Sequence, residues 1–404
     1  MLTTLLKSAL TVVVIAFAGV VLLDPGDKIL HLKLPLLILA LCIWAIRVVC
    51  GMVNPGSLKV VAGVLLFALI LPAAASLIAL LGDTLPVGEP LQFQLIKEFS
   101  VLLIIPVVVS ERIDLTALIL RWSIVIAIFT LLLAGLSLVE PSLFAIVRGI
   151  AVETDNAFIR SRAELGLGIG SFYYKTVSVL VFPIAYHLRK MLNGSGKLAS
   201  AMFTLMFVAA ILCSDSRAAV IGVFIVVAFF VTQKLKIAFG WPPALFALLV
   251  MVVLPAGYFA AFFHPEELSN ATKIGHIHSY ARLFNDHPTY LLWGQGADTE
   301  FYTQGFEAKT TLTELTYLDL IRWFGIPVAA LILGAVVYPI FALAQRANAS
   351  SYLVVPYIAY LWEAASNPLL ICSFGALVVS AMWGRTLLFE AEESSVAQRS
   401  LCVE

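Results

Sequence analysis

The chain has 404 residues, of which 61% are hydrophobic and only 12% are charged, and its 25 cationic side chains balance 25 carboxylates. Because charged residues make up about 25% of a typical soluble domain, this composition excludes a soluble enzyme, a disordered chain and a disulfide-rich secreted scaffold. The zero net charge argues against a nucleic-acid-binding protein, which would carry a basic excess.

The hydrophobic residues number about 246 (61% of 404), close to the demand of twelve transmembrane helices at about 20 residues each. Apolar runs predict twelve such spans. In chain order they cover 9–23, 34–53, 60–82, 95–110, 116–139, 171–188, 198–213, 217–233, 238–263, 322–345, 351–367 and 371–389. The sequence therefore predicts an all-α, polytopic integral membrane protein that forms a single membrane domain over 1–404.

The predicted spans also fix an orientation. An even number of spans places both termini on one side, and cationic short loops mark that side as cytoplasmic. These cations are Arg189, Lys190, Lys197, Lys234, Lys236, Arg346 and Arg399. Two long connections, 140–170 and 264–321, are then predicted on the periplasmic side, the larger one between the ninth and tenth spans.

The tight polar turn between the seventh and eighth spans ends in Arg217, after Ser214, Asp215 and Ser216. At the mouth of a helix an arginine can snorkel or pair with Asp215. It can equally bind an anion, because guanidinium donates forked hydrogen bonds to phosphate oxygens and stays charged at a membrane edge.

The first long loop carries Arg160 and Arg162, followed by Gly166, Gly168 and Gly170. Two arginines before a glycine-rich return favour a loop that folds over an anionic ligand. The alternative is an ordinary solvated loop, since the glycine spacing lacks the preceding strand that phosphate-binding motifs require.

The second long loop carries further candidates for binding a substrate. They are Tyr280, Arg282, His287, Glu314 and Tyr317. The stretch 313–325 has apolar residues at helical spacing, which predicts a short helix that enters the tenth span. In the structural interpretation Thr313 caps this helix and Glu314 lies in its first turn, where an acid is favoured electrostatically.

Two other features of the sequence are considered as functional sites. His276 and His278 lack the third and fourth ligands that a zinc site needs, so no metal site is predicted. Glu363 is a carboxylate within the eleventh span and is therefore a functional candidate.

Three segments of the outer face resemble the O-antigen ligase and O-antigen polymerase superfamily of polytopic bacterial glycosyltransferases. SDSRAAVIGVF (214–224) is similar to the family's Ser-x-Ser-Arg helix start, and SYARLFNDHPTYLLWGQG (279–296) to its Arg…His-Pro…Gly-x-Gly segment. ELTYLDLIRWFGIPV (314–328) resembles the loop-end motif, with Glu314 where ligases have His and Val328 where they have Gly.

The resemblance implies a polyprenyl-pyrophosphate-linked glycan donor and an inverting transfer without a metal, nucleotide or other cofactor. It implies that Arg217 and Arg282 hold the pyrophosphate as it leaves, with Arg160 and Arg162 as supplementary contacts. Glu314 would take the proton from the acceptor hydroxyl or orient the acceptor. The expected location is the bacterial inner membrane, with the active site on its periplasmic side.

Three functions remain open from the sequence. Glu314 in the histidine position favours a polysaccharide polymerase over a ligase that transfers the glycan to a lipid A core or another acceptor. A twelve-span transporter or flippase of lipid-linked sugars is the third. It is disfavoured because no two-fold repeat is visible and because the ionisable residues gather at the outer edge.

Overall fold

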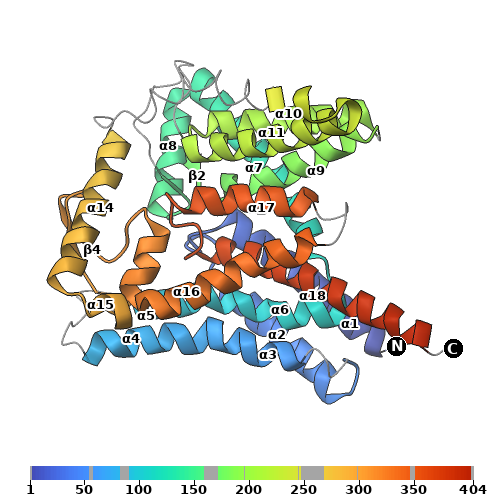
Figure 1. Ribbon diagram of the computed structural model, residues 1–404, viewed down its shortest axis with the longest axis horizontal. Helices are drawn as coiled ribbons and strands as arrows, with labels where there is room; N and C mark the ends of the chain where they lie inside the picture. The colour runs from blue at the N-terminus through green and yellow to red at the C-terminus, as the bar shows by residue number, and fades with distance from the viewer. Residues whose placement is uncertain are drawn as a thin grey trace.

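The computed structural model describes residues 2–53, 58–81, 91–158, 172–194, 196–243, 245–246, 268–297, 299–345 and 351–401. The described chain is mostly α-helical and contains two small antiparallel sheets of two strands each. This confirms the predicted all-α class (Figure 1).

The first half of the chain forms α1 (Leu2–Leu23), α2 (Lys33–Val49), α3 (Leu58–Leu65), a π-helical turn (Leu66–Ile70), α4 (Leu71–Leu81), α5 (Leu91–Phe99), a 3-10 turn (Ser100–Leu103), α6 (Ile104–Glu111), α7 (Leu115–Val139), α8 (Pro141–Glu153), β1 (Ala157–Phe158), β2 (Tyr173–Tyr174), a 3-10 turn (Lys175–Leu180) and α9 (Val181–Leu192). The second half forms α10 (Lys197–Cys213), α11 (Arg217–Phe239), α14 (Leu268–Asp286), α15 (Tyr290–Trp293), β3 (Phe301–Thr303), β4 (Ala308–Thr310), α16 (Thr316–Ala344), α17 (Ser351–Ala364) and α18 (Ser373–Leu401).

Five of the described helical segments are long and apolar enough to cross a membrane. They are Leu2–Leu23, Val60–Ala79, Leu115–Val139, Arg217–Phe239 and Thr316–Ala344. Most of the predicted span 238–263 lies outside the described residues. The predicted span 171–188 begins later as a helix, because residues 173–180 form β2 and a 3-10 turn before α9.

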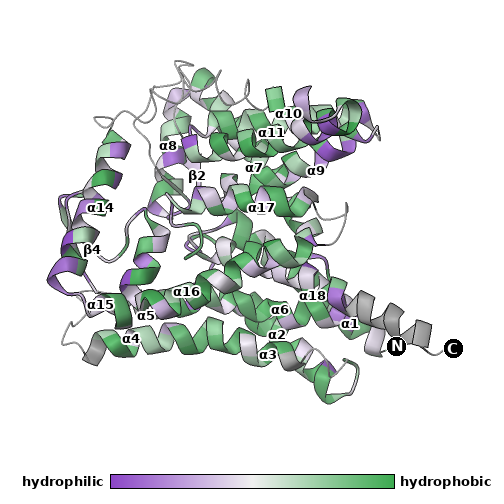
Figure 2. Ribbon diagram, viewed as in Figure 1, coloured by the Kyte–Doolittle hydropathy of each residue, from purple (hydrophilic) through white to green (hydrophobic). Residues whose placement is uncertain are grey.

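The long helices lie roughly parallel, and the two termini come together at one end of the bundle (Figure 1). At the opposite end α14 crosses the bundle next to β4 and α15. Apolar residues dominate the long helices, whereas polar residues are frequent in α14, around β4 and at the end of the α9–α10 region (Figure 2). The loop predicted over 264–321 therefore forms a folded polar layer at the end of an apolar bundle.

Within the bundle α1 packs on α2, α7 and α18, while α9 packs on α10, α11 and α17. One large apolar core runs through both groups, and a smaller core lies around the first half of α16. This smaller core connects the apolar bundle to the polar layer, because it includes Leu320, Trp323 and Phe324 of α16 together with Ala297 of the loop.

Helix α16 is broken at Gly325, where the backbone adopts φ 72° and ψ 164°, two residues before Pro327. A left-handed φ of this kind is readily accessible only to glycine. The break lets the loop approach closely, and the N–H of Gln295 donates to the carbonyl of Arg322 at 2.6 Å. A Cβ at position 325 would overlap the carbonyl of Leu292 at the end of α15.

We expect Gly325→Ala to destabilise the protein by at least about 1 kcal/mol, because alanine is strained at this φ and its Cβ collides with α15. Thermal unfolding in detergent measures the effect. Gly334→Ala, on the same helix with open space around its Cβ, is the matched control and should leave the melting temperature unchanged or slightly higher. Equal melting temperatures for the two variants would contradict the role assigned to the break.

Candidate functional site

The polar layer is built around Arg322, which is completely buried in the first half of α16. Its guanidinium donates to the carbonyl of Thr299 at 2.7 Å, to Gln295 Oε1 at 3.2 Å and to the carbonyl of Thr311. It also pairs with Asp319 Oδ1 at 3.2 Å, one helical turn earlier. Arg322 thus binds both ends of the segment 295–311 to the apolar helix α16.

Asp319 extends this network toward α14 and the residues before α16. Its Oδ1 accepts from Tyr280 Oη at 2.6 Å, and its Oδ2 accepts from Thr313 N at 2.9 Å and Thr313 Oγ1 at 2.8 Å. All three residues are buried. Burial, together with the Asp319 charge, raises the pKa of the Tyr280 phenol. Tyr280 therefore serves here as a hydrogen-bond donor inside the fold.

The start of α16 differs from the sequence prediction. The helix begins at Thr316 after Leu315, and in the described chain no side-chain hydrogen bond caps it. The prediction that Thr313 caps the helix and that Glu314 lies in its first turn is wrong. Asp319 is instead the acid of the first turn, and its carboxylate fixes Thr313, which in turn accepts from Leu315 N at 3.1 Å.

This arrangement turns the Glu314 side chain outward. Glu314 lies between the buried residues Thr313 and Leu315, yet its own side chain is 35% exposed. Its Oε2 lies 3.4 Å from Lys273 Nζ of α14, a side chain that is 25% exposed. The backbone of Glu314 is therefore rigidly held while its carboxylate remains accessible beside one cation.

Two of the predicted arginines, Arg217 and Arg282, lie in different helices, α11 and α14. Arg217 is the first residue of α11, as predicted, after Ser216 caps the helix by accepting from Ala219 N at 3.3 Å. Helix α11 packs on α9 and α17. Arg282 lies exposed near the end of α14, two residues after Tyr280.

The remaining candidates lie near the same layer or outside the described residues. His287 follows α14, is exposed and packs on Tyr290 with ring centroids 5.0 Å apart. Tyr317 donates to the carbonyl of Leu361 at 2.6 Å, which ties α16 to α17. Arg160 and Arg162 both lie outside the described residues.

The loop that carries these two arginines is anchored at its base. Asn156 accepts from Gly26 N at 2.7 Å and donates to Asp24 at 2.9 Å. Ala157 and Phe158 of β1 then pair with Tyr174 and Tyr173 of β2. Both ends of the loop are therefore fixed to the turn after α1.

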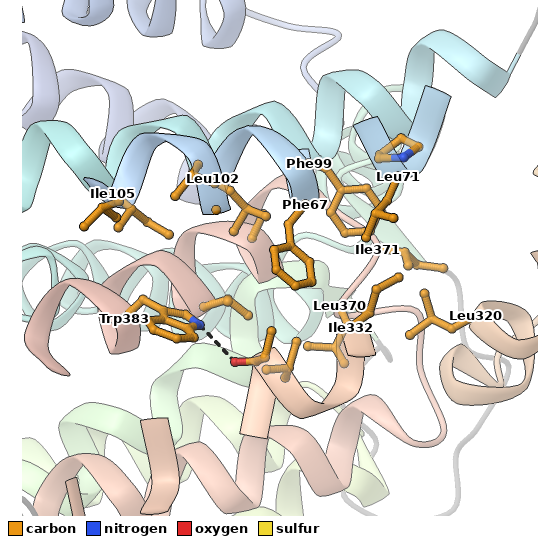
Figure 3. Close-up of a pocket in the computed structure, with 18 of the residues that line it drawn as sticks. Phe67, Leu71, Phe99, Leu102, Ile105, Leu320, Ile332, Leu370, Ile371 and Trp383 are labelled. Carbon is orange, nitrogen blue, oxygen red and sulfur yellow. Dashed lines mark hydrogen bonds between the residues drawn. The ribbon is translucent and has the colours of Figure 1, made fainter. Parts of the chain in front are cut away.

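A cavity of about 260 Å³ lies beneath the polar layer, between the π-helical region of α3–α4, α5–α6, α16 and α18. Its walls are apolar side chains, including Phe67, Leu102, Leu320, Phe324 and Trp383, most of which are labelled in Figure 3. Leu320 and Phe324 lie on α16 next to Asp319 and Arg322, so a single stretch of helix lines the cavity and organises the polar layer.

Two residues that surround Glu314 were not selected from the sequence. They are Lys273, which pairs with the Glu314 carboxylate, and Asp319, which pairs with Arg322 and binds Thr313. Tyr280 and Lys273 are seven residues apart, a spacing that puts both on one face of a helix. Once α14 is recognised as a helix, this spacing predicts that Lys273 and Tyr280 contact the same neighbouring segment. The i,i+3 spacing of Asp319 and Arg322 is a second such signal.

Glu363 near the end of α17 is completely buried and accepts from Tyr173 Oη at 3.4 Å. Within the described part of the chain, no group of three or more His, Cys, Asp or Glu side chains could hold a metal ion. In comparisons with known proteins, the chain matches no family model and no curated protein.

We expect Arg322→Met to destabilise the protein by about 3–5 kcal/mol, because it leaves the Asp319 charge buried without its partner. It should also release residues 295–311 to limited proteolysis. Arg282→Met removes an exposed arginine from the same layer and should change neither readout. A protease-resistant Arg322→Met protein with wild-type stability would contradict the organising role of Arg322.

Proposed function

We propose that this chain is a membrane glycosyltransferase that uses a polyprenyl-pyrophosphate-linked glycan donor, and specifically a surface polysaccharide polymerase. One observation carries the proposal: the accessible Glu314 carboxylate extends from a backbone that a buried network holds, and the adjoining helix α16 lines an apolar cavity through Leu320 and Phe324. A site for a lipid-linked sugar requires both parts, a polar group for the sugar chemistry and an apolar space for the lipid.

The proposed topology has twelve spans, cytoplasmic termini and a periplasmic site in the bacterial inner membrane. The separation of the termini from α14 at opposite ends of the bundle supports this orientation (Figure 1). The cations of the short loops favour a cytoplasmic position for the end that carries the termini.

In the proposed reaction the acceptor hydroxyl oxygen attacks the anomeric carbon of the donor sugar. The bond from that carbon to the pyrophosphate oxygen breaks, and polyprenyl pyrophosphate leaves with the bonding electrons. Glu314 takes the proton of the hydroxyl as a general base. Arg282 and Arg217, with Arg160 and Arg162, stabilise the charge that develops on the pyrophosphate.

The apolar cavity is proposed to take the first units of the polyprenyl chain. Its lining offers branched and aromatic side chains and almost no polar group, which suits a branched hydrocarbon. Because Leu320 and Phe324 line it from α16, a chain held there would end near the residues that fix Glu314.

We expect Glu314→Gln to lower transfer by about 10²–10⁴-fold, the usual contribution of a general base. Arg282→Gln and Arg217→Gln should each lower it by about 10²–10³-fold, as for the loss of a charge-stabilising donor. The measurement is the surface glycan pattern on gels after complementation of a strain from which the gene has been deleted. Glu300→Gln, an exposed acid of the same loop, is the matched control.

The gel pattern also separates the two glycosyltransferase functions. Loss of a polymerase leaves single repeats on the acceptor, whereas loss of a ligase leaves an undecorated acceptor and accumulated lipid-linked polymer. Full activity of both the Arg217→Gln and Arg282→Gln proteins would refute the glycosyltransferase proposal and favour a transporter.

We expect Ala335→Phe, which narrows the cavity, to raise the KM for a long-chain donor about tenfold or more, since a tenfold change corresponds to about 1.4 kcal/mol of binding. A donor analogue with a short prenyl chain should be affected less. Leu331→Phe enlarges an exposed residue of the same helix outside the cavity and is the matched control. An equal loss for long and short chains would show that the cavity does not hold the chain.

A further inference from the structure

His276 of α14 is completely buried beside the Glu314 site, yet the proposed reaction does not use it. Its Nδ1 lies 2.5 Å from Thr303 Oγ1, and its ring packs edge-on against Phe306 with centroids 4.5 Å apart. Gly305 makes room for the ring, because a Cβ at that position would lie 2.5 Å from Nδ1. The imidazole is therefore locked in one orientation.

The face of α14 that carries His276 is the face that contacts the candidate site. Lys273 pairs with Glu314, and Tyr280 bonds to Thr313 and Asp319. Residues at positions i, i+3 and i+7 share one helix face. His276 therefore lies between the contact to Glu314 and the contact to Thr313, the residue that immediately precedes Glu314.

The two ring nitrogens of His276 have different surroundings. Thr303 Oγ1 accepts from Gly305 N at 3.1 Å and can donate its own hydrogen to Nδ1 of His276 at 2.5 Å. When Nδ1 accepts, the proton of a neutral imidazole resides on Nε2. Within the described residues no acceptor lies in hydrogen-bond reach of this buried Nε2. In that tautomer Nε2–H is a buried donor without an acceptor, which is costly and favours a new partner.

Glu314 is the carboxylate best placed to become that partner. Burial lowers the pKa of His276, and among its charged surroundings the Glu314 carboxylate raises it most, followed by Asp319, while Lys273 lowers it. Asp319 already accepts from Tyr280, Thr313 and Arg322, whereas Glu314 is bound by Lys273 at 3.4 Å. That distance is longer than the 2.7–2.9 Å typical of a strong charged hydrogen bond.

We infer that His276 is a positioning residue for Glu314: its Nε2–H binds the carboxylate when the pyrophosphate of the donor draws Lys273 away. This inference rests on the proposed function. Lys273 is partly exposed and lies 3.4 Å from Glu314, so a pyrophosphate with several negative charges competes with this single carboxylate for its ammonium group. The exchange couples donor binding to the orientation of the general base.

The first test requires no substrate. Hydrogen–deuterium exchange at histidine C2, read by mass spectrometry on the whole protein in detergent, gives the pKa of His276. We expect Glu314→Gln to lower this pKa, because it removes the charge that raises it, and Lys273→Met to raise it. Glu300→Gln removes an exposed carboxylate that does not shift the pKa of His276, so this variant should leave that pKa unchanged. An unchanged pKa in both the Glu314→Gln and Lys273→Met proteins would overturn the inference.

The second test uses paired substitutions of His276 itself. Gln places an amide N–H near the position of Nε2, whereas Asn places its amide near Nδ1 and leaves Nε2 without a replacement. With the lipid-linked glycan that accumulates in the deletion strain as substrate, we expect His276→Asn to lower kcat on the order of 10²-fold with little change in KM. His276→Gln should restore most of kcat, and melting temperatures check that both proteins fold.

The outcomes separate this inference from the proposed function. If Glu314→Gln abolishes transfer but His276→Asn and His276→Gln behave alike, the inference is overturned and the proposed function stands. If Glu314→Gln leaves transfer intact, the proposed function is wrong, and the pKa of His276 still shows whether the two side chains communicate.

Discussion

The buried ion pair of Asp319 and Arg322 is the interaction on which the rest of the polar layer depends. Taking two charges out of water is costly and is tolerated only when further hydrogen bonds satisfy both groups. Here the guanidinium also binds Thr299, Gln295 and Thr311, and the carboxylate also binds Tyr280 and Thr313. The same groups that stabilise the charges therefore fasten α14 and the loop to the apolar bundle. The break at Gly325 completes this attachment by opening the helix to α15.

The functional consequence is a division between buried and accessible charges. Asp319 and Arg322 are completely buried and paired with each other, whereas Glu314, Lys273 and Arg282 lie at the accessible edge of the same layer. Catalytic groups need a rigid backbone and an accessible tip, since misplacement by about 1 Å can cost on the order of 10²-fold in rate. Thr313 supplies that rigidity to Glu314, and the adjoining helix α16 lines an apolar cavity through Leu320 and Phe324.

Hydropathy and charge predicted the helical class, the helix that starts at Arg217 and the helix that leads into the tenth span. These features depend on local composition, which a sequence displays directly. The true start of α16, the break at Gly325 and the roles of Tyr280 and Asp319 were not predictable in the same way. They depend on contacts between residues far apart in the chain, such as Tyr280 with Asp319 and Gln295 with Arg322. Glu314 was selected by its position in a motif, whereas its accessibility follows from tertiary packing around Thr313.

The most direct test of the central claim is a reaction of the purified protein in liposomes with the polyprenyl-pyrophosphate-linked glycan from the deletion strain and no other protein. The two products to be measured are free polyprenyl pyrophosphate and lipid-linked glycan of increased length. The proposed function predicts that both products appear together and that both are lost in the Glu314→Gln protein. Unchanged glycan length with no released polyprenyl pyrophosphate, while the intact lipid-linked substrate moves between leaflets, would contradict it and identify the chain as a transporter.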